Sequence, residues 1–470
     1  MLEYSNAVGA LSIKKIPFFP LVQPVRFGTD PEDAIEEMEV IFEGRATLEE
    51  YQSSIKFEPL HQCHETHFNH FPALLNEDGS PWILGNLYLM SLATSYPQPH
   101  HNTLYKTAQA LKDHAKVLEE NGIGVFDFPS RQAKRATYAY RNHWKRIVDE
   151  EPDKEDGANE KIIKVIGFYR WAESNRFFTP ERPMWIETKC SKPLTDGRGR
   201  TFIKEYVKTD LAVKSSGVRS PKKLKPYGDI AQAAIIQALK EIDNTEMNLV
   251  FILSLTTAAR KQTVLTLKKS AFDSFNGQAE FKLRVGKRGA ADTKKQKSFD
   301  IFIPGWLAQD IVDYLKSKRY ADRLALSSEG QDKDYVFLSK IGQPYYARKD
   351  DSMLDQYNAI PVGKAIDAFI RQQLTPHLKS MGHELHIRFH NLRATYANNF
   401  VRGNLDLVNS GQMTMAKLIY EVMEKLGQSS YEQAEKYIGK IQMDELSYIA
   451  QSRIESRLEH VLAGGDVGEE

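Results

Sequence analysis

The sequence predicts a mainly α-helical protein with a small β-sheet, arranged in two main domains. The chain has 470 residues, and at roughly 100–200 residues per domain that length is enough for two or three domains. Apolar residues recur at helical spacing through most of residues 85–176 and again from residue 227 onward. Residues 279–304 instead alternate like a strand, a basic loop and a second strand.

The composition excludes several classes of protein. Hydrophobic residues make up 41% of the chain and charged residues 27%, which excludes collagen-like and wholly disordered classes. No run approaches the ~18 apolar residues of a membrane span, and the first residues lack the pattern of a secretory signal. Cys63 and Cys190 cannot form a disulfide framework. We therefore expect a cytoplasmic protein.

The net charge of +1 hides an uneven distribution. Residues 1–100 hold 5 Lys and Arg against 14 Asp and Glu, so the rest of the chain has a net charge of +10. A basic body of this kind favours a polyanionic partner.

Five segments follow from these patterns. Residues 1–83 form an acidic N-terminal extension of unassigned role, with a helical pattern at 31–52 between irregular stretches. Residues 84–186 are predicted to be a small all-α domain of four helices, at 85–96, 101–122, 131–150 and 158–176. Residues 187–228 are a basic linker with a short hairpin at 200–213, residues 229–440 are the larger domain, and residues 441–470 are a C-terminal helix and tail.

Three pieces of the larger domain contain residues with phosphoryl-transfer chemistry. Arg260 lies between apolar helical segments in LTTAARKQTVLTL, and His390 and Arg393 share a helix face in HNLRATYANNF. Tyr437 ends the piece LGQSSYEQAEKY. Lys287 lies in a turn after the first strand of the β-rich stretch.

These residue types suit nucleophilic attack on a phosphodiester. Two arginine forks can hold the non-bridging oxygens and the extra charge of a pentacovalent transition state. A tyrosine can attack phosphorus if a base takes its proton, and a lysine can protonate the departing oxygen. Such a set needs no metal and no cofactor.

The three pieces resemble the tyrosine recombinases, the phage integrase family. HNLRATYANNF resembles that family's His-x-x-Arg box and LGQSSYEQAEKYI resembles its tyrosine box. Tyr437 lies nine positions after Gln428, as is usual in that family. Lys287 follows Arg260 by 27 residues, on the strand turn where the family places its lysine, and YVFLSKIGQPY resembles a further family segment. The resemblance covers residues 229–440 closely and 85–185 loosely.

This resemblance implies a fold, an activity and roles. The expected fold is mainly α, with a helical core-binding domain and a catalytic domain that form a C-shaped clamp on DNA. Tyr437 would form a 3′-phosphotyrosyl bond, Arg260 and Arg393 would hold the phosphate, and His390 would manage the tyrosine proton. Lys287 would protonate the leaving oxygen, and Gln428 would add a hydrogen bond.

Three positions depart from the family pattern. Gln428 stands where the family usually has His or Trp, and it can donate a hydrogen bond but carry no charge. Asn391 replaces a common Asp, and Thr263 replaces an acidic residue. These departures concern rate and local positioning.

Several alternatives stay open at this stage. Tyr431 and Tyr420 are rival nucleophiles, and Lys294 or Lys295 are rivals of Lys287 as the proton donor. His61, Cys63, His64, His67 and His70 form a cluster that is either surface histidines or a zinc site, of which we expect the former and hence no metal.

The expected partners follow from the resemblance and the charge. Double-stranded DNA is the main partner, contacted by Lys222, Lys223, Arg288, Lys294 and Lys295. A homo-tetramer would assemble on two DNA sites from a chain that can be monomeric without DNA, with accessory proteins as further candidates. The C-terminal helix would dock in a neighbouring protomer, or else pack on its own domain. The alternatives in function are a type IB topoisomerase-like relaxation enzyme and a catalytically weak DNA-binding homologue.

Overall fold

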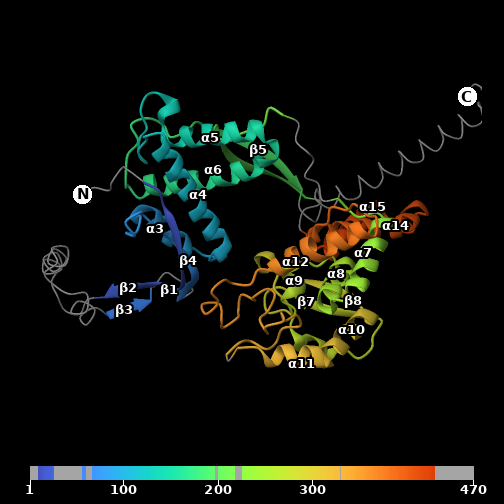
Figure 1. Cartoon of the computed structure of the whole chain (residues 1–470). Coiled ribbons are helices and arrows are strands. Elements are labelled where there is room, and N and C mark those ends of the chain that lie inside the picture. Colours follow the sequence, from blue (N-terminus) through green and yellow to red (C-terminus); the bar gives the residue numbers. More distant parts are fainter. Residues whose placement is uncertain are drawn as a thin grey trace, which may run out of the picture. The chain divides into compact units, whose positions relative to one another are not determined.

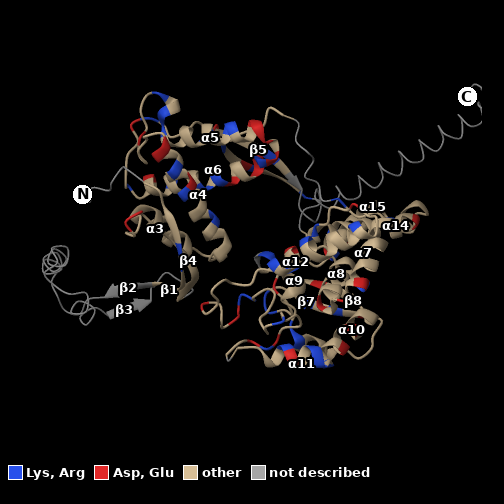
Figure 2. Ribbon diagram, in the orientation of Figure 1, with Lys and Arg blue, Asp and Glu red and all other residues tan. Residues whose placement is uncertain are grey.

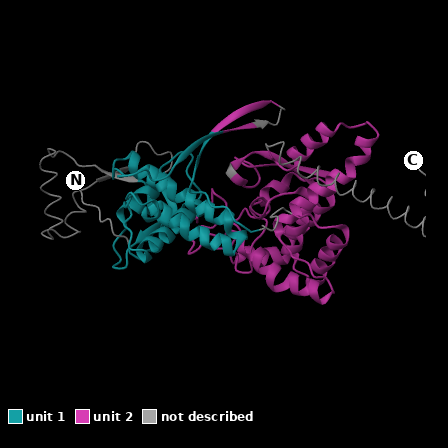
Figure 3. Ribbon diagram, turned by 90° about the horizontal axis from the view of Figure 1, so that it is seen from above, with its two compact units in different colours: residues 1–190, 206–221 teal, residues 191–205, 222–470 magenta. Residues whose placement is uncertain are grey.

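The computed structural model describes residues 9–25, 56–59, 66–195, 200–217, 225–328 and 330–428 (Figure 1). It divides into two compact units, each with its own core (Figure 3). Unit 1 comprises residues 1–190 and 206–221, and unit 2 comprises residues 191–205 and 222–470. Helices predominate and the strands form two-stranded sheets, so the predicted mainly α fold with small sheets is confirmed.

The four predicted helices of unit 1 are confirmed. They are α3 (Ile83–Ala93), α4 (His101–Glu120), α5 (Ala136–Glu150) and α6 (Glu155–Ser174), with single 3₁₀ turns at Gln132–Lys134 and Pro152–Lys154. The long helix α4 buries the face that contains Leu104, Leu111 and Leu118, as its helical spacing requires. It ends shortly before Gly122, which has a φ of +62°, a conformation that stops a helix.

The N-terminal residues differ from the expectation. The Pro-rich start is not irregular but forms strand β1 (Ser12–Pro20), which pairs antiparallel with β4 (His67–Leu75); β2 (Val22–Val25) pairs with β3 (Lys56–Pro59). Phe68, Phe71 and Leu74 of β4 lie in the same core as the helices. The boundary expected near residue 83 therefore does not separate two cores. The expected helix at 31–52 lies outside the described residues.

The linker hairpin is longer than expected and begins earlier. Strand β5 (Glu187–Thr195) pairs with β6 (Thr201–Thr209), so the segment predicted to contain a whole hairpin provides only its second strand. The first strand was missed because its Lys, Ser and Pro residues have low strand propensity. Of the His/Cys cluster, His67 and His70 lie in strand β4, whereas His61, Cys63 and His64 lie outside the described residues.

Unit 2 is built around the buried helix α8 (Thr245–Thr257). Around it lie α7 (Asp229–Ile242), α9 (Lys261–Leu265), a 3₁₀ segment (Lys269–Ser274), β7 (Glu280–Val285), a 3₁₀ turn (Lys294–Gln296), β8 (Phe299–Pro304), α10 (Gly305–Lys316), α11 (Lys318–Ala325), α12 (Lys364–Phe369), a π-helical turn (Ile370–Leu374), α13 (Thr375–Ser380), α14 (Phe389–Asn409) and α15 (Met415–Lys425). Phe251 of α8 meets Phe389 of α14 edge-to-face, with ring centroids 5.1 Å apart. The predicted strand–loop–strand is confirmed as the antiparallel pair β7–β8.

A buried histidine lies at the centre of unit 1. His114 is 1% exposed, and its Nε2 lies 2.7 Å from the hydroxyl of Tyr169, which donates to the carbonyl oxygen of Val125. Because that hydroxyl has only one proton to give, His114 must donate through Nε2 and leave Nδ1 unprotonated. Nδ1 has no hydrogen-bond partner among the described residues. Burial accordingly lowers the pKa of His114 to about 3.

This histidine makes the stability of the chain depend on pH. Below pH 6.5 the unfolded chain binds a proton at His114 that the folded chain does not bind until about pH 3. The free energy of unfolding should therefore fall with acidification in that window, by up to about 1.4 kcal/mol per pH unit from this group. Urea unfolding between pH 7.5 and 4.5 measures the slope. In His114→Phe the slope should be shallower, and an unchanged slope would contradict the assignment.

Candidate active site in unit 2

Arg260 is presented by a tight turn between α8 and α9. Ala258 ends α8 with a φ of +57°, and the hydroxyl of Ser254 donates to the carbonyl oxygen of Ala259 at 3.0 Å. The hydroxyl oxygen of Thr257 accepts the N–H of Ala259 at 3.2 Å. These bonds fix the backbone just before Arg260, which lies half-buried at the start of α9. The next turn contains Thr263, which is buried.

Arg393 lies near the start of α14 and is almost completely buried, at 2% exposure. Its Nη1 donates to the carbonyl oxygen of Ala258 at 2.7 Å, and its Nη2 donates to the carbonyl oxygen of Leu426. Arg393 therefore connects the turn before Arg260, the helix α14 and the turn after α15. The structure thus brings together two of the predicted pieces, and the beginning of the third.

His390 lies one turn before Arg393 on α14. His390 is exposed, yet partial desolvation by the surrounding protein lowers its pKa, and the nearby charges of Arg393, Arg260 and Lys294 lower it further. A histidine whose pKa is lowered is neutral at pH 7 and can accept a proton. Asn391, beside it, is buried, and its carbonyl oxygen accepts from the hydroxyl of Thr395.

The loop between β7 and β8 is held in place at both ends. Gly286 has a φ of +102°, and a Cβ there would lie 2.4 Å from the carbonyl oxygen of Lys297. The N–H of Asp292 donates to the hydroxyl of Thr266 at 2.9 Å, which ties the loop to the end of α9. Lys287, Arg288 and Lys294 are exposed on this loop.

Lys297, at the end of this loop, feels the charges of both site arginines. Its Nζ donates to the carbonyl oxygen of Gly427 at 3.1 Å, next to the Leu426 carbonyl that Arg393 binds. Partial burial of the ammonium group lowers the pKa of Lys297, and Arg260 and then Arg393 lower it further. A lysine with a lowered pKa gives up its proton more readily, as a general acid must.

Sequence reasoning did not single out Lys297. Phe299, Ile301 and Ile303 form the buried face of β8. Lys297 has an extended backbone, with φ −64° and ψ 126°, but its side chain is exposed, so the buried alternation begins only at Phe299. Lys287 shares the parity of the buried residues of β7, but the positive φ of Gly286 interrupts the alternation before it.

The turn after α15 completes the described part of the site. Gly427 has a φ of +54°, and a Cβ there would lie 2.7 Å from the ring of Phe299. Gln428 follows it, and its backbone N–H donates to the carbonyl oxygen of Met423 at 2.9 Å. Its buried Oε1 has no hydrogen-bond partner among the described residues. Tyr437 and Tyr431, Lys222 and Lys223, and the C-terminal helix lie outside the described residues, as does the side chain of Lys295.

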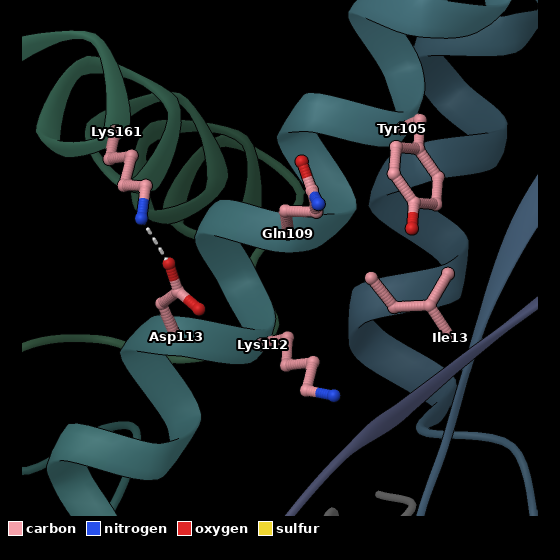
Figure 4. Close-up of a pocket in the computed structure, with 6 residues that line it drawn as sticks. All are labelled: Ile13, Tyr105, Gln109, Lys112, Asp113 and Lys161. Carbon is pink, nitrogen blue, oxygen red and sulfur yellow. Dashed lines mark hydrogen bonds and ion pairs between the residues drawn. The ribbon is translucent and has the colours of Figure 1, made fainter. Parts of the chain in front are cut away.

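A hollow of about 400 Å³ in unit 1 has a different character (Figure 4). It lies between β1, α4 and α6 and is lined by Ile13, Tyr105, Gln109, Lys112, Asp113 and Lys161. Lys161 and Asp113 form an ion pair across it. Lys and Arg alternate with Asp and Glu over these helices (Figure 2). The hollow therefore lacks the concentration of like charge found around Arg393.

Two kinds of feature are absent from the described part of the chain. No cluster of three or more His, Cys, Asp and Glu side chains there could hold a metal ion. None of its helices combines the length and apolar character that crossing a membrane requires.

Comparison with known proteins gives structural matches only. No protein-family model and no curated protein matches the chain. The chain is similar to the integrase of the transposon Tn1549 in complex with a circular-intermediate DNA, with 12% identity, a TM-score of 0.44, and 75% of this chain and 94% of that chain covered.

It is also similar to lambda integrase in two solved assemblies. A dimer bound to a COC′ core site has 14% identity and a TM-score of 0.43, covering 76% of this chain and 94% of that chain. A tetramer bound to a Holliday junction has 15% identity and a TM-score of 0.41, covering 89% of this chain and 95% of that chain.

The two site arginines should differ sharply in their effect on stability. Arg393→Ala removes a buried group and leaves the carbonyl oxygens of Ala258 and Leu426 without their donor, so it should lower the free energy of unfolding by about 2–4 kcal/mol. Arg260→Ala, at a half-buried position, is the matched control and should cost less than about 1 kcal/mol. Urea unfolding measures both. Equal costs would show that the two carbonyl contacts do not stabilise the fold.

Proposed function

We propose that this chain is a site-specific DNA recombinase of the tyrosine type, which cuts and rejoins DNA through a 3′-phosphotyrosyl intermediate. The observation that carries the proposal is the grouping of the three cations Arg260, Arg393 and Lys297 with the neutral His390, on three segments of the chain. A cluster of like charges is unfavourable by itself and is stabilised by an anion. A phosphodiester that gains charge in its transition state is such an anion.

The proposed cleavage step uses each group once. The hydroxyl oxygen of Tyr437 forms a bond to phosphorus, and the bond from phosphorus to the 5′ oxygen breaks. His390, neutral because of its lowered pKa, takes the proton of the tyrosine. Arg260 and Arg393 hold the non-bridging oxygens, and a lysine gives a proton to the 5′ oxygen. The freed 5′-hydroxyl of a partner duplex then reverses the same step.

We assign the proton donation to Lys297. Partial burial of its ammonium group, and then Arg260 and Arg393, lower the pKa of Lys297, and its Nζ lies against the same turn that Arg393 binds. Lys287, which the sequence favours, is the alternative; it is exposed, as Lys297 also is, and it is proposed to contact the DNA backbone. Gln428 is proposed to add a hydrogen bond to the phosphate.

The proposed assembly follows from the reaction. Exchanging two duplexes requires both strands of each to be cut, and hence four tyrosines. A tetramer on two DNA sites provides one from each protomer. The basic linker with Lys222 and Lys223, and the loop residues Arg288, Lys294 and Lys295, are proposed to contact the DNA backbone as the chain closes around the duplex. A mobile element is the proposed genetic context.

The nucleophile can be tested by trapping. Incubated with a nicked duplex that carries the recombination site of the encoding element, the protein should form a covalent DNA adduct that maps to Tyr437. Tyr437→Phe should form none and keep its affinity within about twofold, because it loses one hydroxyl and no cation. Tyr431→Phe is the matched control and should form the adduct. An adduct at Tyr431 would overturn the assignment, and supercoil relaxation without any recombinant product would favour a topoisomerase.

The proton donor can be tested with an altered leaving group. Replacing the bridging 5′ oxygen by sulfur gives a thiolate leaving group, with a thiol pKa near ~8.5, which departs without a proton. Lys297→Ala should slow cleavage of ordinary DNA by about 10²-fold or more and cleave the sulfur substrate at nearly the wild-type rate. Lys287→Ala should slow neither by more than a few-fold. The opposite pattern would assign the proton to Lys287.

A further inference from the structure

The β5–β6 hairpin has two faces of different chemistry. A connection of residues 196–200 joins the strands, so they run antiparallel, and the backbone N–H of Asp210 donates to the carbonyl oxygen of Ile186 at 3.1 Å. This bond places residue 186 opposite residue 210, and Lys192 therefore lies opposite Lys204. Figure 3 shows the two strands, which change from teal to magenta along their length.

One face combines aromatic rings with positive charge. Phe202, Lys204, Tyr206 and Lys208 alternate along β6 on this face, and Lys192 of β5 shares it. Nζ of Lys208 lies 5.5 Å from the centroid of the Tyr206 ring. The described side chains of this face include three lysines and no acid.

The other face of the hairpin has acidic side chains and lacks aromatic rings among its described residues. It contains Glu187, Lys189, Ile203, Glu205 and Val207, with no aromatic ring among the described side chains. Glu187 is paired with Arg170. The acids of the hairpin strands are therefore confined to one face, and the aromatic rings to the other.

The aromatic face is exposed. Phe202 is 51% exposed and Tyr206 is 36% exposed, although large apolar rings normally stay in the core of a folded chain. Alternate residues on a strand are about 6.8 Å apart, so the rings and the lysines form a single row. A row of this kind suits a single-stranded nucleic acid, because its bases can stack on the aromatic rings while the lysines neutralise the phosphates between the bases.

We propose that this face binds a single strand of DNA whose bases are unpaired. Within the proposed function, on which this inference rests, the strand that ends in the freed 5′-hydroxyl must leave its complement before it attacks the partner duplex. Its bases are then unstacked and expose their faces to water. In an intact duplex the base faces are covered, so the rings would have no comparable partner there.

The test compares the two faces of one strand in the full chain. Binding is measured by fluorescence anisotropy with labelled dT20 and with a 20-base-pair duplex that lacks the recombination site. Phe202→Ser with Tyr206→Ser should weaken binding of dT20 by about 10-fold or more and change duplex binding by less than about twofold. Ile203→Ser with Val207→Ser, at residues that are 72% and 47% exposed on the opposite face, is the matched control and should change neither.

Two further measurements keep the result unambiguous. Phe202→Leu with Tyr206→Leu preserves apolar side chains without rings and should show the same selective loss. Photocrosslinking of dT20 that carries 5-iodouracil should attach to the peptide of residues 201–208. Equal losses on dT20 and duplex, equal effects of the two faces, or crosslinks elsewhere would each overturn the proposal. Covalent trapping at Tyr437 is measured on a duplex, so it tests the recombinase proposal separately.

Discussion

The site depends on one buried cation. Arg393 is 2% exposed, and burying a guanidinium among apolar residues is unfavourable unless its N–H groups find acceptors. Two of the acceptors are backbone carbonyl oxygens, of Ala258 and Leu426, from segments far apart in the sequence. Because Arg393 donates to both carbonyls, one side chain of α14 links the Arg260 turn to the turn after α15.

The same cation determines the protonation chemistry around it. A carbonyl oxygen reduces the local charge without cancelling it, so Arg393 and Arg260 still act on their neighbours. They lower the pKa of Lys297 and of His390, in addition to the effect of burial. A lowered pKa has a different consequence in each group. It makes the lysine a better proton donor, and it keeps the histidine neutral and able to accept a proton. The same two arginines can therefore adjust the pKa of both the acid and the base of a single reaction step.

The sequence predicted the features that follow from local periodicity. The four helices of unit 1 and the β7–β8 pair were predicted because their buried faces repeat at the helical and strand periods. Strand β1 was missed because its partner strand β4 comes more than 40 residues later and because its own residues, exposed or half-buried, form no buried face. Lys297 was passed over for a related reason: its importance depends on the Gly427 carbonyl, 130 residues away, and no spacing rule contains that contact.

Tyr227, at the end of the linker, also supports the site through two hydrogen bonds. The hydroxyl of Tyr227 accepts the N–H of Arg388 at 2.8 Å, and the backbone N–H of Tyr227 donates to the hydroxyl of Thr395 at 2.9 Å. Both partners flank His390 and Arg393 on the same helix. Because a hydrogen bond at each end fixes the direction of the first turn of α14, the residue where the linker ends is part of the framework that orients the two side chains. Tyr227 is therefore a positioning residue of the site, although it is far from the chemistry in sequence.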